Sequence, residues 1–480
     1  MSRDTKIVAT LGPASSDADV LERMILAGVD VVRLNFSHGN REDHVERARL
    51  VREVSARVGR PVGILVDLQG PKIRVGKFAD NKIWLERGTR FILDAKCELG
   101  TQERVGLDYK DLTRDVSAGC VLLLDDGRIV LVVDRVVGSE IYTTVRHGGE
   151  LSNNKGINRQ GGGLSAAALT AKDMEDIRTA ASIEADFVAV SFPKSAADMY
   201  MAKQLINAAG GHALTIAKIE RVEAVAALEE IIAASDGVMV ARGDLAVEVG
   251  DAAVPALQKR MIRLAREKNK LAITATQMME SMIVSPAPTR AEVSDVANAV
   301  LDGSDAVMLS AETASGKFPV ETIEAMARIC QEAEKSSEVT LDREFLNRIF
   351  TRIDQTISLA AIWTAHHLKV KAIAALSESG ATALWMSRLN CGVPVYALTP
   401  QPEAVTKMCL YRAVFPLFMT QRPTTRDELL YDAEQLLMNT GIVQKGDFIV
   451  LTSGDPMGTS GGTNTLKIVR VGDQQPYDHG

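Results

Sequence analysis

The first part of the chain alternates short apolar runs with amphipathic helical stretches. Each apolar run is rich in Val, Ile, Leu or Ala and ends in polar residues before a helical pattern begins. Near-continuous apolar strands are typical of parallel sheets that helices cover on the outside. Eight runs are predicted as strands, at residues 6–10, 31–35, 62–67, 187–191, 214–219, 237–241, 272–276 and 306–310. Eight strand–helix units predict a (β/α)8 barrel.

The rhythm breaks between the third and fourth runs. Residues 72–164 contain many short alternating runs and no long helical pattern, and 122–134 is typical of a β-hairpin. We interpret 72–164 as an inserted, mostly β domain, a small β-barrel, which divides the catalytic barrel into 1–71 and 165–345. Because the insertion follows a barrel strand at the catalytic end, it is placed to act as a lid.

A second α/β series begins near residue 346. Strands are predicted at 372–376, 394–398, 414–418 and 448–451, with helices between them, and only about five strands fit. That number is too small for a second barrel, so we expect an open C-terminal α/β domain over 346–480. The predicted fold class is therefore α/β, a TIM barrel with a β lid and a separate C-terminal domain.

Composition and charge narrow the functional classes. The chain has 480 residues, of which 46% are hydrophobic and 24% charged, as expected for a packed globular protein. A net charge of −7 argues against nucleic acid or an anionic membrane as the main partner. The five cysteines form no CxxC pair, so a reducing compartment fits better than a disulfide framework or a zinc cluster. No apolar stretch approaches the ~20 residues that span a bilayer, and we expect a cytoplasmic protein.

Polar side chains stand at the carboxyl ends of most predicted barrel strands. They include Arg33, Asn35, Asp67, Lys218, Glu220, Arg242, Asp244, Thr276 and Glu312. Residues two apart on a strand face the same side, so these groups are expected to gather at one mouth of the barrel. In this fold, polar residues at that mouth are typically catalytic.

The residue types indicate a metal-dependent reaction of a phosphorylated compound. Glu220 and Asp244 are hard oxygen ligands with no His or Cys nearby in sequence, which favours Mg²⁺ or Mn²⁺. Arg33 and Lys218 add positive charge, and phosphoryl transfer is mainly positioning and charge stabilisation. The chain has no Walker A sequence and no GxGxxG after a strand, so a nucleotide must be held by other means.

Each of these residues also has a purely structural interpretation. Lys218 and Glu220 can form a simple ion pair, Arg33 can anchor a loop, and Thr276 can be a satisfied core hydroxyl. A turn is the ordinary role of a Gly-Asp pair such as the one at Gly243. Their shared position at equivalent strand ends favours the functional interpretation.

Longer motifs extend along most of the chain. They are TLGPA at 10–14, RLNFSHG at 33–39, DLQGPKIR at 67–74, NKGIN at 154–158, AKIE at 217–220, MVARGDL at 239–245, ATQMMESM at 275–282 and MLSAET at 308–313. Together they are very specific, and through them the chain resembles the pyruvate kinases. The resemblance implies Mg²⁺-dependent phosphoryl transfer from phosphoenolpyruvate to ADP, giving pyruvate and ATP in the final step of glycolysis. It also implies a homotetramer with an allosteric effector.

The resemblance implies a role for each residue at the mouth. Glu220 and Asp244 would hold the Mg²⁺, while Lys218 and Arg33 would bind the transferring phosphoryl group. The backbone at Gly243 and Asp244 and the hydroxyl of Thr276 would hold the substrate carboxylate, and Thr276 would join the proton path to the enolate carbon. The residues that resemble nucleotide contacts are Asn35, Phe36, Ser37, His38, Arg74 and Lys155.

One departure from the family concerns potassium. Members that need K⁺ carry Glu where this chain has Lys72. In those members the ion lies among groups that match Asn35, Ser37, Asp67 and Leu68. The Lys72 ammonium can supply that positive charge instead, so we expect an enzyme that does not require K⁺. The alternative is a Lys72 that points to solvent.

A polar loop in the C-terminal domain resembles the phosphate pocket for an effector. It consists of Ser377, Glu378, Ser379, Gly380, Ala381 and Thr382, between a predicted strand and a helix. Hydroxyls, glycine and a helix N-terminus can bind an anion, although a plain helix cap is the alternative. The segment 460–464 can close over the pocket. The Glu378 carboxylate leaves the ligand open between a sugar phosphate and a nucleoside monophosphate.

Two other functions compete with this one. A Mg²⁺-dependent pyruvate lyase or aldolase would also use a carboxylate pair and an Arg, but such barrels lack the lid and the effector-type domain. A non-catalytic metabolite sensor could keep the fold, but the joint presence of Lys218, Glu220, Asp244 and Thr276 argues against it.

Overall fold

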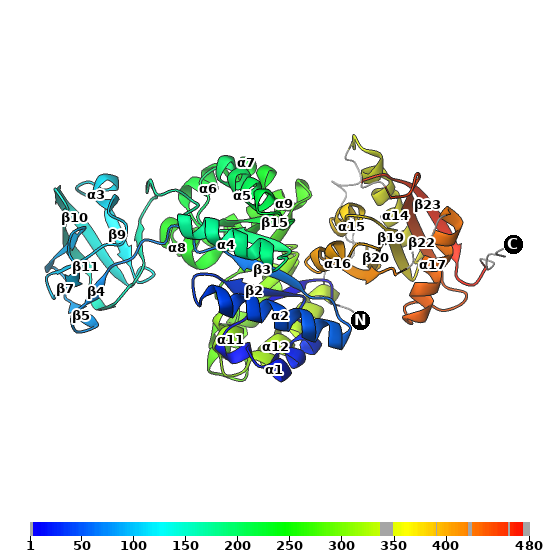
Figure 1. Ribbon diagram of the computed structural model, residues 1–480, viewed down its shortest axis with the longest axis horizontal. Helices are drawn as coiled ribbons and strands as arrows, with labels where there is room; N and C mark the ends of the chain where they lie inside the picture. The colour runs from blue at the N-terminus through cyan, green and yellow to red at the C-terminus, as the bar shows by residue number, and fades with distance from the viewer. Residues whose placement is uncertain (1–2, 337–348, 390, 421–424, 459–460, 474–480) are drawn as a thin grey trace.

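The computed structural model describes residues 3–336, 349–389, 391–420, 425–458 and 461–473. These residues form three bodies in a row, with the barrel in the middle (Figure 1). The inserted β domain and the C-terminal α/β domain lie at opposite ends of the barrel. The proposed limit between residues 345 and 346 falls outside the described residues.

Eight parallel strands close the barrel in the order β1-β18-β17-β16-β15-β14-β3-β2. The strands are β1 (Lys6–Thr10), β2 (Val31–Asn35), β3 (Gly63–Asp67), β14 (Phe187–Val190), β15 (Leu214–Ile219), β16 (Gly237–Ala241), β17 (Leu271–Ala275) and β18 (Ala306–Leu309). Nearly all their residues are buried, because side chains fill the barrel on one face and the helices cover the other. The eight predicted strands are confirmed, each within one residue at either end.

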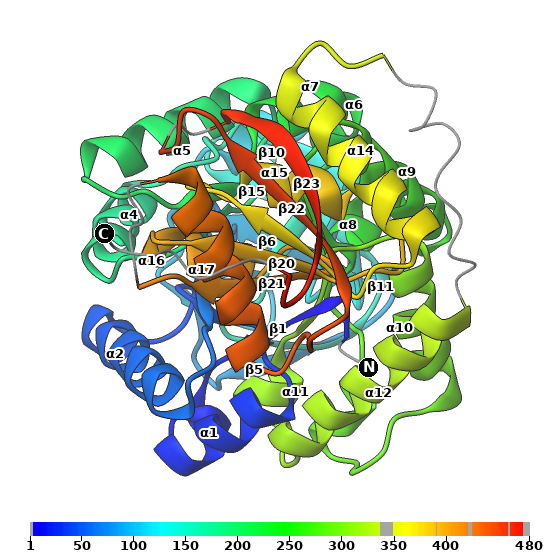
Figure 2. The ribbon, with the colours of Figure 1, turned by 90° about the vertical axis from the view of Figure 1, so that its right-hand side faces the viewer.

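Helices surround the barrel strands on all sides (Figure 2). They are η1 (Pro13–Ser15), α1 (Ala18–Ala27), α2 (Arg41–Val58), α4 (Ala171–Ser182), α5 (Ala196–Ala208), α6 (Val222–Ala226), α7 (Leu228–Ala234), α8 (Arg242–Val249), η2 (Asp251–Ala253), α9 (Val254–Glu267), η3 (Glu280–Ile283), α10 (Arg290–Leu301), α11 (Ala311–Ala314) and α12 (Pro319–Ser336). Several begin at a side-chain cap, as where Asp17 accepts the first free N–H groups of α1. Within the described ranges, no helix has the length and apolar character needed to cross a bilayer.

The inserted domain is mostly β, as predicted, but its strands form a six-stranded sheet and two short ribbons instead of the expected closed small barrel. Its elements are β4 (Lys77–Phe78), β5 (Lys82–Leu85), β6 (Arg90–Asp94), β7 (Leu99–Gly100), β8 (Arg104–Val105), α3 (Leu112–Asp115), β9 (Val121–Leu124), β10 (Ile129–Val137), β11 (Glu140–His147), β12 (Gly149–Ser152) and β13 (Ile157–Arg159). Six strands form one sheet in the order β13-β9-β10-β11-β6-β8, and two short ribbons complete the domain. A separate core, which includes Phe91, Leu131 and Ile141, holds it together.

The C-terminal domain is an open sheet in the order β21-β20-β19-β22-β23. Its described elements are α14 (Ile353–Leu368), β19 (Ala372–Leu376), α15 (Ala381–Ser387), β20 (Val395–Thr399), α16 (Pro402–Met408), β21 (Val414–Phe418), α17 (Arg426–Asn439), β22 (Phe448–Gly454) and β23 (Thr463–Arg470). The open sheet is confirmed. The fifth strand, β23, was not placed by the apolar pattern, and it runs antiparallel to β22.

The C-terminal domain packs directly on the amino ends of the barrel strands. Arg388 forms an ion pair with Asp305, and the side chains of both residues are only 1% exposed. The Lys6 ammonium, which is also buried, donates to the backbone oxygen of Val414 at 2.7 Å. One apolar cluster contains both barrel residues such as Leu65 and C-terminal residues such as Met408, so the two domains share a core.

Candidate active site

Charged side chains from three strands converge at the carboxyl ends of the barrel. Arg33 on β2 donates through Nε to Oδ2 of Asp67, the last residue of β3, at 2.7 Å. Lys218 on β15 places its Nζ 3.2 Å from Oδ1 of Asp67 and 2.9 Å from Oε1 of Glu220. These four residues therefore form one continuous network of ion pairs, as the strand-end pattern predicts.

Burial makes these charges strongly dependent on one another. Burial opposes the charge on Lys218, but Asp67 and Glu220 raise its pKa above the ordinary value. Burial also favours the neutral form of Asp67, yet Lys218 and Arg33 lower the pKa of that carboxyl. Burial raises the pKa of Glu220 to about 7, against the pull of Lys218 and with the help of the negative charge of Asp244. A cation beside Glu220 and Asp244 would offset that repulsion.

Ser191 fixes the position of the Lys218 ammonium. Lys218 Nζ donates to Ser191 Oγ at 2.7 Å, and Ser191 Oγ donates to the backbone oxygen of Leu68 at 2.7 Å. The next residue, Phe192, has φ +56° and donates its backbone N–H to Glu220 Oε2 at 2.9 Å. The sequence pattern did not single out Ser191, whose only signal is its place at the end of the fourth predicted strand.

Thr276 and Gly243 meet at the ends of β17 and β16. The Gly243 N–H donates to Thr276 Oγ1 at 2.9 Å, and that hydroxyl donates to the backbone oxygen of Ala275 at 2.7 Å. Thr276 has φ +66°, a left-handed conformation that is rare for a β-branched residue. Arg242 donates through Nη2 to the Thr276 oxygen at 2.7 Å and through Nη1 to Asp295 at 2.6 Å. Such strain is often found at functional sites, and Arg242 was not predicted to support it.

The carboxylate pair fits a divalent cation. Asp244 lies in the first turn of α8, and its negative charge contributes to the raised pKa of Glu220. In the described part of the chain, no group of three or more His, Cys, Asp and Glu could hold a metal ion. A pair of hard oxygen donors completed by water or substrate is what Mg²⁺ accepts.

The loop after β2 is held by its own polar groups. Asn35 Oδ1 accepts the Ser37 N–H at 3.1 Å. The Phe36 ring is buried and stacks on His44 with centroids 4.0 Å apart, while the Phe36 N–H donates to the backbone oxygen of Asp67 at 3.0 Å. Phe36 therefore supports the loop from below, and Asn35 and Ser37 are more accessible to a ligand.

Arg74 and Lys72, at the start of the inserted domain, lie near His38. Its pKa is lowered by partial burial and then by the positive charges of Arg74, Lys72 and Arg33. Lys155, on the returning crossing, pairs with Asp125 of the lid, with 2.8 Å between Nζ and Oδ1.

Lys72 adds positive charge to this region without an ion pair to Asp67. The two ion pairs of Asp67 come from Arg33 and Lys218. Among the residues that the structure describes, Lys72 has no carboxylate within 4.0 Å of its ammonium. Its contribution to the neighbouring groups is therefore electrostatic and longer in range.

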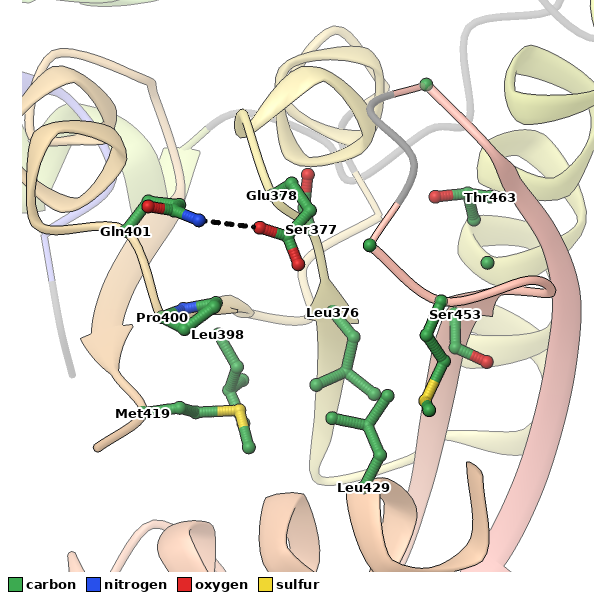
Figure 3. Close-up of a pocket in the computed structure, with 14 residues that line it drawn as sticks. Leu376, Ser377, Glu378, Leu398, Pro400, Gln401, Met419, Leu429, Ser453 and Thr463 are labelled. Carbon is green, nitrogen blue, oxygen red and sulfur yellow. Dashed lines mark hydrogen bonds between the residues drawn. The ribbon is translucent and has the colours of Figure 1, made fainter. Parts of the chain in front are cut away.

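A cavity of about 400 Å³ lies in the C-terminal domain at the carboxyl edge of β19 (Figure 3). It is lined by Leu376, Ser377, Glu378, Leu398, Pro400, Gln401, Met419, Leu429, Ser453, Gly454, Met457, Gly458, Gly461 and Thr463. Glu378 Oε2 accepts from Gln401 Nε2 at 3.0 Å, while Ser377 Oγ accepts the Gly380 N–H at 3.0 Å. Thr382 is buried against Thr463, and Ser460 lies outside the described residues.

Comparison with known proteins decides the family. The barrel-domain model of pyruvate kinase matches residues 2–323, and the alpha/beta-domain model of pyruvate kinase matches residues 355–469. Pyruvate kinase II of Salmonella typhimurium is 51% identical over 477 residues, covering 98% of this chain and 99% of its own length. This chain belongs to the pyruvate kinase family. The pyruvate kinases of Haemophilus influenzae and Mycobacterium tuberculosis are 51% and 42% identical over 475 and 474 residues, each covering 98% of this chain and 99% of its own length.

Family membership gives the protein its reaction class. It is a pyruvate kinase-type phosphotransferase of glycolysis, and the family generally uses Mg²⁺ and K⁺. The predictions of fold class and enzyme class are confirmed. The lyase and sensor alternatives have no support from the comparisons, because both domains match pyruvate kinase over nearly the whole chain.

Proposed function

We propose that the mouth of the barrel transfers the phosphoryl group of phosphoenolpyruvate to ADP, with Lys218 as the central cation. The supporting observation is the buried network in which Lys218 lies between Asp67 and Glu220 and is fixed by Ser191. A fixed ammonium can stabilise the charge that spreads over the transferring group, at no cost of reorganisation. Arg33 binds the same group, and its guanidinium is held by Asp67 and by the Thr10 hydroxyl, which accepts from Nη1 at 3.0 Å.

Glu220 and Asp244 hold the divalent cation, Mg²⁺ or Mn²⁺. Held there, a divalent cation would supply positive charge that offsets the negative charge of the substrate oxygens and of the phosphoryl group. The Phe192 N–H orients the Glu220 carboxylate by donating to Oε2.

The carboxylate end of the substrate lies against β16 and β17. The backbone at Gly243 and Asp244 and the Thr276 hydroxyl receive it, exchanging the internal Gly243–Thr276 hydrogen bond for contacts with the ligand. Thr276 also lies on the path by which a proton reaches the enolate carbon. Arg242 keeps Thr276 in its strained backbone conformation during this exchange.

The nucleotide lies between the loop after β2 and the lid. Asn35, Ser37, His38 and Arg74 contact it, while Phe36 supports the loop. Lid closure would detach Lys155 from Asp125 and bring its ammonium to the phosphates.

The monovalent-cation region contains Asn35, Ser37, Asp67, Leu68 and Lys72. The charge of Lys72 replaces K⁺ there, which makes the ion unnecessary for turnover. The closeness of Lys72 to this region is supported by its effect on the pKa of His38.

The C-terminal cavity is the site of a phosphorylated effector, a sugar phosphate or a nucleoside monophosphate. Ser377, Glu378, Ser379, Gly380 and Thr382 form the loop that would receive it, and the first two line the cavity. The enzyme works as a cytoplasmic homotetramer, with domain limits at 1–71 and 165–345, 72–164, and 346–480.

One coupled assay tests the central proposal. The full chain is supplied with phosphoenolpyruvate, with and without ADP, while Mg²⁺ and K⁺ are varied, and pyruvate is followed through lactate dehydrogenase. We expect pyruvate only when ADP and Mg²⁺ are both present, and no response to K⁺. Pyruvate formed without ADP, or phosphoenolpyruvate bound without turnover, would contradict the proposal.

A further inference from the structure

Glu248 is a buried carboxylate that the proposed mechanism does not use. It lies in the last turn of α8 and is only 6% exposed. Its Oε2 accepts the backbone N–H of Val222 at 3.0 Å. Burial raises the pKa of Glu248 to about 7, although the Val222 hydrogen bond works in the opposite direction. Because burying a carboxylate is costly, this position calls for a physical reason.

The Glu248–Val222 hydrogen bond joins the two segments that carry the proposed metal ligands. Val222 begins α6, two residues after Glu220, so its N–H belongs to the loop that carries Glu220. Asp244 precedes Glu248 by four residues on α8, which places both carboxylates on one face of that helix. The hydrogen bond therefore ties the Glu220 loop to the Asp244 helix.

Apart from Glu248, the first turn of α6 is held by Glu223, whose Oε1 accepts the backbone N–H of Gly163. The first N–H groups of a helix have no partner within the helix, and α6 has no side-chain cap from Arg221. Arg221 is 3% exposed, lies over the Phe192 ring at 5.3 Å, and has no hydrogen bond at Nη1 among the described residues. Glu248 thus acts as the cap of α6, supplied from a different helix.

Asp244, Glu248, Arg221 and Phe192 also line one small cavity, so α8 and the loop after β15 meet at this point. The negative charge of Asp244 is among the causes that raise the pKa of Glu248, as it is for Glu220. The two carboxylates of α8 are therefore close enough to influence each other, and both face the loop after β15.

We infer that Glu248 is a positioning residue, whose hydrogen bond to Val222 sets the spacing of Glu220 and Asp244 for the divalent cation. The inference rests on the proposed function, because it assumes that those two carboxylates bind the metal. Loss of the hydrogen bond frees the Glu220 loop, so the free enzyme binds the cation more weakly. Changes to groups that orient metal ligands typically weaken binding by about 10-fold to 100-fold, and we expect about tenfold here.

The test measures Mn²⁺ binding to the full chain without substrate, by the electron paramagnetic resonance signal of free Mn²⁺. Glu248→Ala removes the acceptor, and Glu248→Gln keeps an amide oxygen in its place. Val222→Pro removes the donor at the first helical position, where proline is tolerated, and Val222→Ala keeps the donor. We expect Glu248→Ala and Val222→Pro each to weaken Mn²⁺ binding about tenfold. Glu248→Gln and Val222→Ala should remain close to the original chain.

The double variant Glu248→Ala/Val222→Pro sharpens the test. Both changes remove the same hydrogen bond, so the double variant should bind Mn²⁺ no more weakly than either single variant. Saturating Mg²⁺ should restore most of kcat in every variant, because a positioning residue shifts the metal requirement and leaves the bound-state chemistry intact. If Glu248→Ala does not fold, as judged by circular dichroism, the comparison of Val222→Pro with Val222→Ala decides.

The variant Asp244→Asn distinguishes failure of this inference from failure of the proposed metal site. The variant Asp251→Asn, at an exposed position just beyond α8, is the control for the loss of a negative charge. If Asp244→Asn weakens Mn²⁺ binding while Glu248→Ala and Val222→Pro do not, the inference is wrong and the metal site stands. If Asp244→Asn has no effect either, the metal site is wrong and the inference fails with it. A loss in Glu248→Gln as large as in Glu248→Ala would also overturn the role of the hydrogen bond.

Discussion

The two appended domains are joined to the barrel in opposite ways. At the amino ends of the strands, the C-terminal domain shares an apolar core with the barrel and adds the buried Arg388–Asp305 ion pair. At the carboxyl ends, the lid has a core of its own. A contact with the barrel there falls on the returning segment of the lid, where the Gly163 N–H donates to Oε1 of Glu223.

The difference indicates which domain can move as a body. The lid can reorient without exposing the barrel core, because the apolar surface it buries is mainly its own. Displacing the C-terminal domain would open a shared core and separate two buried charges, which is far more costly. We therefore expect fast rearrangement at the catalytic end, and we expect a structural change at the C-terminal cavity to be passed on to the barrel.

The largest expected effect is the loss of Lys218 at the catalytic end. Lys218→Met should lower kcat by about 10³-fold, because a preorganised group that stabilises the transition state is lost. The coupled assay measures this change. Lys203→Met, on the exposed face of α5, should leave kcat unchanged. A Lys218→Met enzyme with near-normal kcat would show that the charged mouth of the barrel is structural.

The next effect concerns the opposite end. Asp305→Ala leaves the buried Arg388 guanidinium without its carboxylate, so the free energy of unfolding should fall by about 3–5 kcal/mol. Urea denaturation followed by circular dichroism measures the change. The matched control is Lys82→Ala, which breaks an exposed ion pair of the lid and should cost less than about 1 kcal/mol. Equal effects of the two substitutions would remove the proposed contrast between the domains.

A smaller effect is expected for the potassium requirement. Lys72→Glu should lower kcat about tenfold in K⁺-free buffer, equivalent to about 1.4 kcal/mol, and added K⁺ should restore it. Lys77→Glu, at an exposed position of the lid, is the control for charge reversal. A strong K⁺ activation of the unaltered chain would contradict the role given to Lys72.

The smallest effect is expected in the C-terminal cavity. Glu378→Gln keeps a partner for Gln401 and removes a negative charge beside the proposed phosphate. Binding of a sugar phosphate such as ribose 5-phosphate, measured by calorimetry, should strengthen about fivefold, or about 1 kcal/mol. Asp427→Asn, at the exposed start of α17, should leave it unchanged. Weaker binding in Glu378→Gln would mean that the carboxylate recognises a positive group.

The barrel could be read from the sequence because its strands are defined locally. A buried parallel strand such as Phe187–Val190 is an uninterrupted apolar run, and its neighbours in space are also mainly apolar. The strand β23 was missed because its mixed polar pattern acquires meaning only from its pairing with β22. Local pattern thus predicts elements that are buried on both faces and fails at exposed edges.

The charged residues of the candidate site could be predicted from the sequence. The residues that hold them in position could not. Lys218 and Glu220 stand out at a strand end, but Ser191 matters through Leu68, 123 residues away. Glu248 accepts a hydrogen bond from Val222, which lies 26 residues earlier in the sequence and in a different strand–helix unit. Phe36 belongs to the RLNFSHG motif although its ring faces the core, which only the packing against His44 reveals. Such roles arise from tertiary contacts that no short window of sequence contains.

Pro71 and Leu164, from the two crossings of the lid, line the same small cavity. The two connections between the barrel and the lid therefore lie close together in space. Modules inserted at such closely spaced points can be exchanged, trimmed or lost without rethreading the host. A short turn between Pro71 and Leu164 would keep the chain continuous and leave the closed eight-stranded barrel intact. We therefore expect the sequence of the lid to vary more freely during evolution than the residues at the mouth of the barrel beneath it.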